Sequence, residues 1–170
     1  MGQLDIILLI LLSGFVLFGL WFGLVHTLGS LIGTIVGSFL AGHYYAPLTD
    51  WLLPITGGNP NLIKVIVFIF LFIIGNRLVG FVFWIIEKIF GVLKILPFLS
   101  TIDHLLGGVF GLLEGVLVIG LTLYFISKFP FSEWLTGAML TSGVAAYLIK
   151  VSALLLPLLP DALKAVQGVF

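Results

Sequence analysis

Long uninterrupted apolar stretches dominate the pattern of hydrophobic and polar positions along this chain of 170 residues. Four of these stretches reach the roughly 20 residues that a helix needs to cross the hydrocarbon core of a bilayer. Their apolar positions do not alternate with polar ones, which argues against a transmembrane β-barrel. The pattern therefore predicts an all-α membrane bundle with four transmembrane helices, over residues 4–25, 28–46, 62–86 and 102–127.

Polar and turn-forming residues mark the expected connections. His26 and Thr27 predict a tight turn between the first two spans, and Pro47 is expected to end the second span because proline removes a backbone donor. A stretch rich in Pro, Gly and Asn then leads to the third span. Residues 89–99 are apolar but too short to cross a bilayer, and with Lys94 they predict a segment at the membrane interface.

The C-terminal part allows two interpretations. Residues 141–159 are apolar but contain Lys150 and Pro157, so they can form either a helix at the interface or a fifth span. The expected organisation is a transmembrane bundle over residues 1–128 and a membrane-associated helical segment over residues 129–170.

Composition supports a membrane protein. Apolar residues make up 61% of the chain and charged residues 8%, whereas soluble domains carry about 25% charged residues. The net charge is zero and no basic block is present, so we expect no nucleic-acid partner. There are no cysteines, and no Lys or Arg precedes Lys64. A signal peptide would need a basic start, so the first apolar stretch is interpreted as a retained span.

Two charged residues lie deep inside apolar stretches. Arg77 lies ten residues before Glu87, and Glu114 lies eleven residues after Asp103. If the third and fourth spans are antiparallel, the two charges lie roughly 15 and 16 Å from the shared end. Charges inside the bilayer face protein or water and tend to pair. The sequence therefore predicts that Arg77 and Glu114 form an intramembrane pair that fixes how these two helices pack.

Small residues at intervals of four predict close helix contacts, because they let two backbones approach each other. We interpret them as packing surfaces, with a pore or a homo-oligomer face as the functional alternative. Those in the second span are Gly29, Gly33, Gly37 and Ala41, and those in the fourth are Gly107, Gly111 and Gly115.

The sequence shows no catalytic constellation and no cofactor motif, so we expect a protein without enzymatic activity or cofactor. His26, Asp103 and His104 belong to connections that we place on one side of the membrane, and three such groups can in principle hold a metal ion. We interpret them as polar residues at span ends and expect no metal.

The order of these features resembles the colicin V production protein family of the bacterial inner membrane. Asp5 opens the first span, as an early Asp does in that family. The stretch from Gly19 to Gly33 looks like the glycine-rich hairpin turn of the family. The run from Asp103 and His104 to Gly115 looks like its Asp-Arg-x-Leu-Gly…Gly-x-x-Arg-Gly signature, and Trp134, Ser142 and the late prolines are similar to its C-terminal pattern.

Four positions depart from the family pattern. Phe22, His26, His104 and Glu114 stand where the family usually carries basic residues, so the basic cytoplasmic connections are weaker here. Arg77 is then the other half of a charge exchange with position 114.

The resemblance implies a non-enzymatic inner-membrane protein that assists toxin production or export and envelope homeostasis, with its N-terminus outside the cytoplasm. Expected partners are the lipid bilayer and either a second copy of the chain or membrane proteins of secretion and the envelope. A small channel or transporter, with a polar path near Asn76, Arg77 and Glu114, is the alternative. A membrane-embedded enzyme is disfavoured because the sequence offers no nucleophile beside a base.

Overall fold

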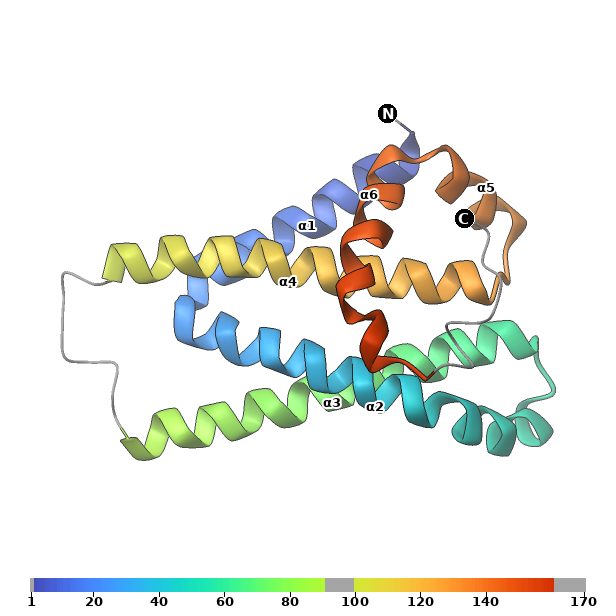
Figure 1. Cartoon of the computed structure of the whole chain (residues 1–170), viewed down its shortest axis with the longest axis horizontal. Helices are drawn as coiled ribbons and strands as arrows, with labels where there is room; N and C mark the ends of the chain where they lie inside the picture. Colours follow the sequence, from blue (N-terminus) through green and yellow to red (C-terminus); the bar gives the residue numbers. More distant parts are fainter. Residues whose placement is uncertain (1, 91–99, 161–170) are drawn as a thin grey trace.

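Helices account for nearly all of the chain in a computed structural model that describes residues 2–90 and 100–160 (Figure 1). Four of them are long and apolar enough to cross a membrane, which confirms the predicted all-α bundle. The long helices are α1 (Gln3–Phe22), α2 (Leu24–Thr56), α3 (Pro60–Phe90) and α4 (Ser100–Lys128), and the C-terminal elements are α5 (Glu133–Thr141), α6 (Gly143–Ser152) and the 3₁₀ helix η2 (Ala153–Leu158). The expected interfacial segment, 89–99, falls mainly outside the described residues.

Glycines end the first two helices, at positions that differ from the predicted ones. The turn between α1 and α2 is Gly23, with φ of +81°, so His26 and Thr27 lie inside α2. The prediction that Pro47 ends the second span is wrong, because α2 continues through Pro47 to Thr56. A proline removes one backbone hydrogen bond and crowds the preceding turn, but the buried residues on either side of Pro47 keep the helix packed. Gly57, in the left-handed conformation, ends α2.

The long helices pack side by side in the order α1, α4, α2, α3. The glycines of α2 lie against α3: a Cβ atom at Gly37 would be 2.7 Å from the carbonyl oxygen of Phe72. The glycines of α4 lie against α1: a Cβ atom at Gly111 would be 2.5 Å from the carbonyl oxygen of Phe15. The small residues therefore bring α2 onto α3 and α4 onto α1. The predicted packing surface of the second span thus has α3 as its partner, which a stripe of glycines alone does not specify.

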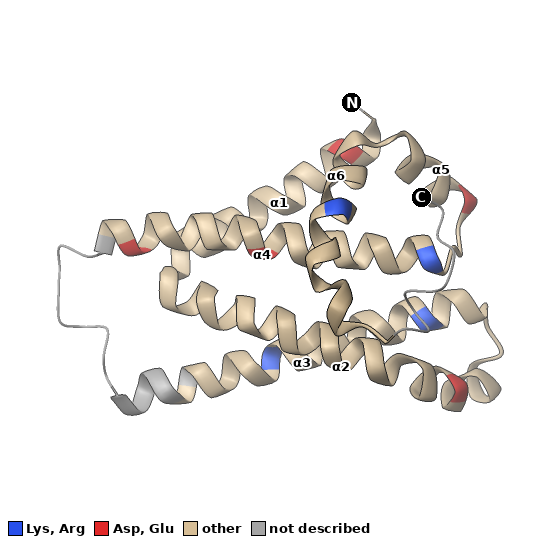
Figure 2. Cartoon of the chain, in the orientation of Figure 1, with Lys and Arg blue, Asp and Glu red and all other residues tan. Residues whose placement is uncertain are grey.

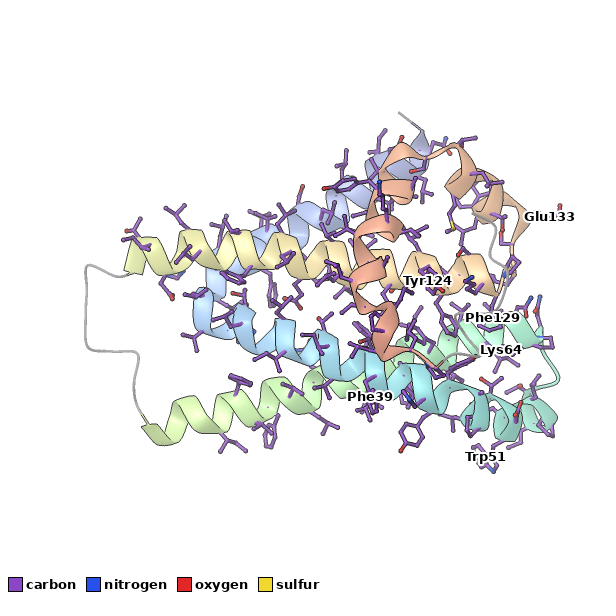
Figure 3. The ribbon with its side chains drawn as sticks, in the orientation of Figure 1. Phe39, Trp51, Lys64, Tyr124, Phe129 and Glu133 are labelled. Atoms are coloured by element: carbon purple, nitrogen blue, oxygen red, sulfur yellow. The ribbon has the colours of Figure 1, made fainter. Side chains whose placement is uncertain are left out.

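An aromatic cluster fills the bundle at the end where α2 leads into α3. Phe68 of α3 stacks on Phe125 of α4 with ring centroids 3.9 Å apart, and Tyr45 of α2 meets Phe125 edge-on at 5.0 Å. Nearby, the ammonium group of Lys64 lies 4.8 Å from the ring centroid of Phe129 (Figure 3). The third and fourth spans thus meet here, at this closed end, rather than along their whole length.

The C-terminal elements do not form a straight fifth span. α5 and α6 are bent by 89° at Ser142, and α6 crosses α4 instead of running beside it, so that η2 reaches α2 (Figure 1). Gly120 of α4 makes this crossing close, because its backbone lies directly against Leu148 and Ser152 of α6. The C-terminal segment is therefore a bent helical pair that packs across the outside of the bundle.

Candidate functional site

Charged residues lie mainly toward the ends of the long helices (Figure 2). Asp5 and Asp103 lie in the first turns of α1 and α4, and Glu114 lies in the interior of α4. Each carboxylate accepts a hydrogen bond from a different helix, at a different place in the bundle. Their partners divide them into two structural anchors and one cleft residue.

Asp5 anchors the C-terminal helical pair. Its side chain is only 5% exposed. The carboxylate accepts hydrogen bonds from the Ser142 hydroxyl and from the backbone N–H groups of Val144 at 3.3 Å and Gly2 at 2.8 Å. Ser142 also caps α6 by accepting from the Ala145 N–H group. The first helix thus supplies a negative charge to the N-terminus of α6, where free N–H groups favour it.

Asp103 anchors the turn between α1 and α2. Its carboxylate, from the first turn of α4, accepts a hydrogen bond from the Leu24 N–H group at 3.2 Å. Leu24 is the first residue of α2, so α4 supplies the cap that α2 lacks in its own sequence. Gly23 makes room for this contact, because a side chain there would collide with the Asp103 carboxylate. The family-like motif residue is therefore a cap that joins three helices.

His104 follows Asp103 and carries an unsatisfied polar atom. Its Nδ1 atom is buried without a hydrogen-bond partner among the described residues. The same part of the chain contains no group of three His, Cys, Asp or Glu side chains close enough to hold a metal ion. His26 instead stacks on Phe22, with ring centroids 4.7 Å apart. The structure thus does not bring the two histidines together with Asp103 as a metal-binding group.

Glu114 lies at the centre of the bundle and is 7% exposed. Its carboxylate accepts a hydrogen bond from the Ser30 hydroxyl of α2, and it also interacts with the Asn76 side chain of α3. The Asn76 amide in turn donates to the Thr34 hydroxyl at 3.3 Å. Three helices therefore contribute polar groups to one buried cluster, which we call the Glu114 cluster (Ser30, Thr34, Asn76 and Glu114).

Arg77 lies beside this cluster with its side chain exposed on the bundle surface. It acts electrostatically on the Glu114 carboxylate, and both residues line a cavity of about 530 Å³. The direct hydrogen-bond donor to Glu114 is Ser30 of α2 rather than Arg77. The structure therefore places the predicted partners at one site, and whether they stabilise each other as a pair stays a prediction.

The cavity is a cleft between α1 and α3. Phe15 and Phe18 of α1 form one side, and Phe72 and Arg77 of α3 form the other. Because α4 and α2 lie between these two helices in the packing order, Glu114 and Ser30 belong to its floor. A second cavity of about 440 Å³ adjoins it and shares four of its residues, His26, Ser30, Asn76 and Arg77.

A comparison with known protein families matches the part of the chain that contains these contacts. A family described as Colicin V production protein matches residues 4–153, a range that includes both anchors and the Glu114 cluster. The chain belongs to this family. Family membership confirms the resemblance drawn from Asp5, Asp103 and the glycine-rich stretches. No solved structure matches the chain.

A curated member of the colicin V production family extends this result. The Colicin V production protein of Escherichia coli (strain K12) is 33% identical over 107 residues. The match covers 63% of this chain and 62% of the relative, so the chain spans less than two thirds of the length of that relative.

Sequence reasoning missed the partners of the anchors. Ser142 was noted only as part of the family pattern, although a serine directly before the apolar stretch 143–149 is a typical helix N-cap signal. Ser30 is not an obvious site residue, because a serine beside the glycine stripe of the second span predicts packing alone. No local signal indicates that Ser30 reaches Glu114, since the two are 84 positions apart in sequence.

Proposed function

We propose that this member of the colicin V production family is a non-enzymatic component of the bacterial inner membrane that assists toxin production or export. The observation that carries the proposal is the family match over residues 4–153, within which Asp5 and Asp103 act as structural anchors. No nucleophile lies beside an activating base in the sequence, and this supports a role in assembly or assistance rather than in catalysis. A second copy of the chain or envelope proteins would be its partners within the bilayer.

Complementation tests this role. The chain should restore release of colicin V in Escherichia coli cells that lack their own colicin V production protein. Measuring toxin inside and outside the cells separates production from export: a defect in export leaves toxin inside. Full-length, membrane-inserted protein that restores neither pool would contradict the proposal.

The proposed orientation places the N-terminus and the connection between α2 and α3 outside the cytoplasm. The lysines that flank the spans are evenly divided between the two sides of the membrane, so their count does not indicate an orientation. The support therefore comes from the family. The chain has no cysteine of its own. A Gly58→Cys variant should therefore react with a membrane-impermeant thiol reagent in intact cells, and Thr101→Cys should not. The reverse result would invert the topology.

A small transporter or channel is the second candidate. The observation that favours it is the cleft, in which Asn76, Arg77 and Glu114 place polar groups in the middle of apolar helices. A conduction path needs such groups to line a hydrated passage. Ion or solute flux into vesicles containing the purified protein, compared with the Glu114→Gln variant, tests this candidate. Equal flux from protein-containing and empty vesicles would exclude it.

A further inference from the structure

The cleft between α1 and α3 has the size of a small-molecule site. Its volume is about 530 Å³, within the range of roughly 300–1,000 Å³ that is usual for ligand pockets. Among the described residues, α1 packs on α4 and α3 packs on α2, so the two walls belong to different helix pairs. In a bilayer such a cleft faces lipid sideways, and its occupant has to suit both polar and apolar neighbours.

Arg77 is the cationic group on the wall of this cleft, and its side chain is exposed. Its guanidinium carries five N–H donors, and within the described part of the chain it donates no hydrogen bond to a protein acceptor. Glu114 acts on it electrostatically, but the Glu114 carboxylate is engaged by the Ser30 hydroxyl. An exposed arginine in the middle of an apolar helix is costly without an anion or water beside it. The planar guanidinium is suited to phosphate or carboxylate.

Away from Arg77 and the polar residues of α2, Asn76 and Glu114, the lining of the cleft is apolar. Phe15 and Phe18 on α1 face Phe72 and Ile73 on α3. These aromatic and aliphatic side chains offer no hydrogen bonds, so they suit a hydrocarbon chain better than an ion or a sugar. The cleft thus combines an exposed cation on one wall, a Glu114 carboxylate already held by Ser30 on its floor, and apolar walls. An anionic head group and a hydrocarbon chain suit the wall cation and the apolar walls.

Two glycines indicate that a molecule other than the chain itself occupies the cleft. Glycine weakens a helix interior, and most glycines of the long helices are explained because a Cβ atom would collide with a neighbouring helix. Gly14 of α1 and Gly80 of α3 differ, since a Cβ atom at either would meet nothing within 4 Å. Gly14 lines the cleft and Gly80 lines the adjoining cavity. The small side of each helix therefore faces space that the chain itself leaves open.

We propose that the cleft binds an anionic amphiphile, with a phosphate or carboxylate head on Arg77 and an apolar chain between the phenylalanines of α1 and α3. The site goes beyond the proposed role in toxin production, because binding is measured on the purified protein without any toxin. The head contacts the outward donors of Arg77, while Glu114 below keeps its bond to Ser30. Membrane phospholipids and free single-chain amphiphiles share this chemistry.

Native mass spectrometry of the full chain in mild detergent tests the proposal. Dodecyl phosphate represents the free amphiphile and dioleoyl phosphatidylglycerol represents the bilayer lipid, with dodecanol and dioleoylglycerol as their uncharged counterparts. We expect at least one anionic probe to bind more tightly than its counterpart, and the better probe assigns the source. Arg77→Gln should weaken that binding by about tenfold or more, the effect of losing a charge-assisted contact. Lys150→Gln, which removes an exposed cation on α6, should leave it unchanged.

A second pair of variants tests where the chain of the amphiphile lies. Gly14→Leu places a side chain in the cleft, at a position where a Cβ atom meets nothing within 4 Å. Gly137→Leu adds the same side chain to α5, where a Cβ atom also meets nothing within 4 Å, and serves as the control. Gly14→Leu should weaken binding of both the anionic probe and its uncharged counterpart, whereas Gly137→Leu should not. The proposal is overturned if neither anionic probe is preferred over its counterpart, or if Arg77→Gln binds like the unaltered chain. Failure here with successful complementation would reject the binding site and leave the proposed function standing.

Discussion

At one end of the bundle, α2, α3 and α4 close around Phe68 and Phe125, which are 1% and 0% exposed. Toward the other end, α3 and α4 are separated, and Arg77 and Glu114 line a cleft between the helices. The same two helices supply both regions. Where their aromatic side chains stack, α3 and α4 are in contact. At the open end, the hydrogen bond to Glu114 of α4 comes from Ser30 of α2 and not from α3. Packing therefore closes one half of the bundle and leaves a cleft with polar groups in the other half.

The largest expected effect on stability separates glycines that are packed against a neighbouring helix from glycines that face free space. Gly111→Leu would force a side chain against the backbone of Phe15, and overpacking of this kind costs about 1–3 kcal/mol or more. Gly14→Leu places the same side chain on the partner helix α1, where a Cβ atom meets nothing within 4 Å. Thermal unfolding in detergent should show a strong loss for Gly111→Leu and a small one for Gly14→Leu. Equal losses would mean that the cleft is not open.

The Glu114 cluster comes next. Glu114→Leu leaves the Ser30 hydroxyl without its acceptor, and an unsatisfied buried polar group costs about 1–3 kcal/mol. Glu114→Gln keeps an acceptor and should cost less. Arg77→Leu, combined with Glu114→Leu in a double-mutant cycle, should recover part of the loss, because neighbouring charges couple by about 0.5–3 kcal/mol. Strictly additive losses would show that the two residues do not form the predicted pair.

The anchor at Asp103 should have a moderate effect. Asp103→Ala removes the acceptor for the Leu24 N–H group, and loss of a helix cap costs about 0.5–2 kcal/mol. Asp103→Asn retains a side-chain oxygen and serves as the matched control. Hydrogen exchange at the first turn of α2 should increase in Asp103→Ala and stay closer to that of the unaltered chain in Asp103→Asn. Unchanged exchange in Asp103→Ala would remove this residue from the turn.

The anchor at Asp5 should have a local effect. Asp5→Ala removes the acceptor for Ser142 and for the N-terminus of α6, so α5 and α6 should be cleaved faster by protease while the four long helices persist. The loss in global stability should be smaller than for Gly111→Leu, since α6 packs across the bundle rather than within it. Proteolysis confined to the connection between α1 and α2 would contradict this role.

The sequence predicted the four long helices because each is a continuous apolar stretch of spanning length. It could not predict which helices pack together, since a stripe of glycines such as that of α2 marks a contact face without naming its partner. It also placed the end of α2 at Pro47, although proline costs one hydrogen bond and the buried contacts of Tyr45 and Thr49 outweigh that loss. At the bend, Ser142 donates a hydrogen bond to Asp5, which is 137 positions away, and no local pattern predicts such a contact.

The sequence predicted only part of the candidate site. Arg77 and Glu114 were identified because a charge inside an apolar stretch stands out from its neighbours. Ser30 and Gly14 were not, because serine and glycine are common at ordinary helix contacts. Only the three-dimensional arrangement shows that one holds Glu114 and that the other faces open space.

Two serines of α2 allow the most direct test of the difference between the closed and open halves. Ser30 lines both cavities, and Ser38, two turns further along, is fully buried at 0% exposure. Because the chain contains no cysteine, Ser30→Cys and Ser38→Cys each introduce a single thiol with little change in volume. In lipid vesicles, a small membrane-permeant thiol reagent should modify Cys at position 30 and leave position 38 unmodified. Equal protection at both positions, or faster reaction at position 38, would contradict the open cleft.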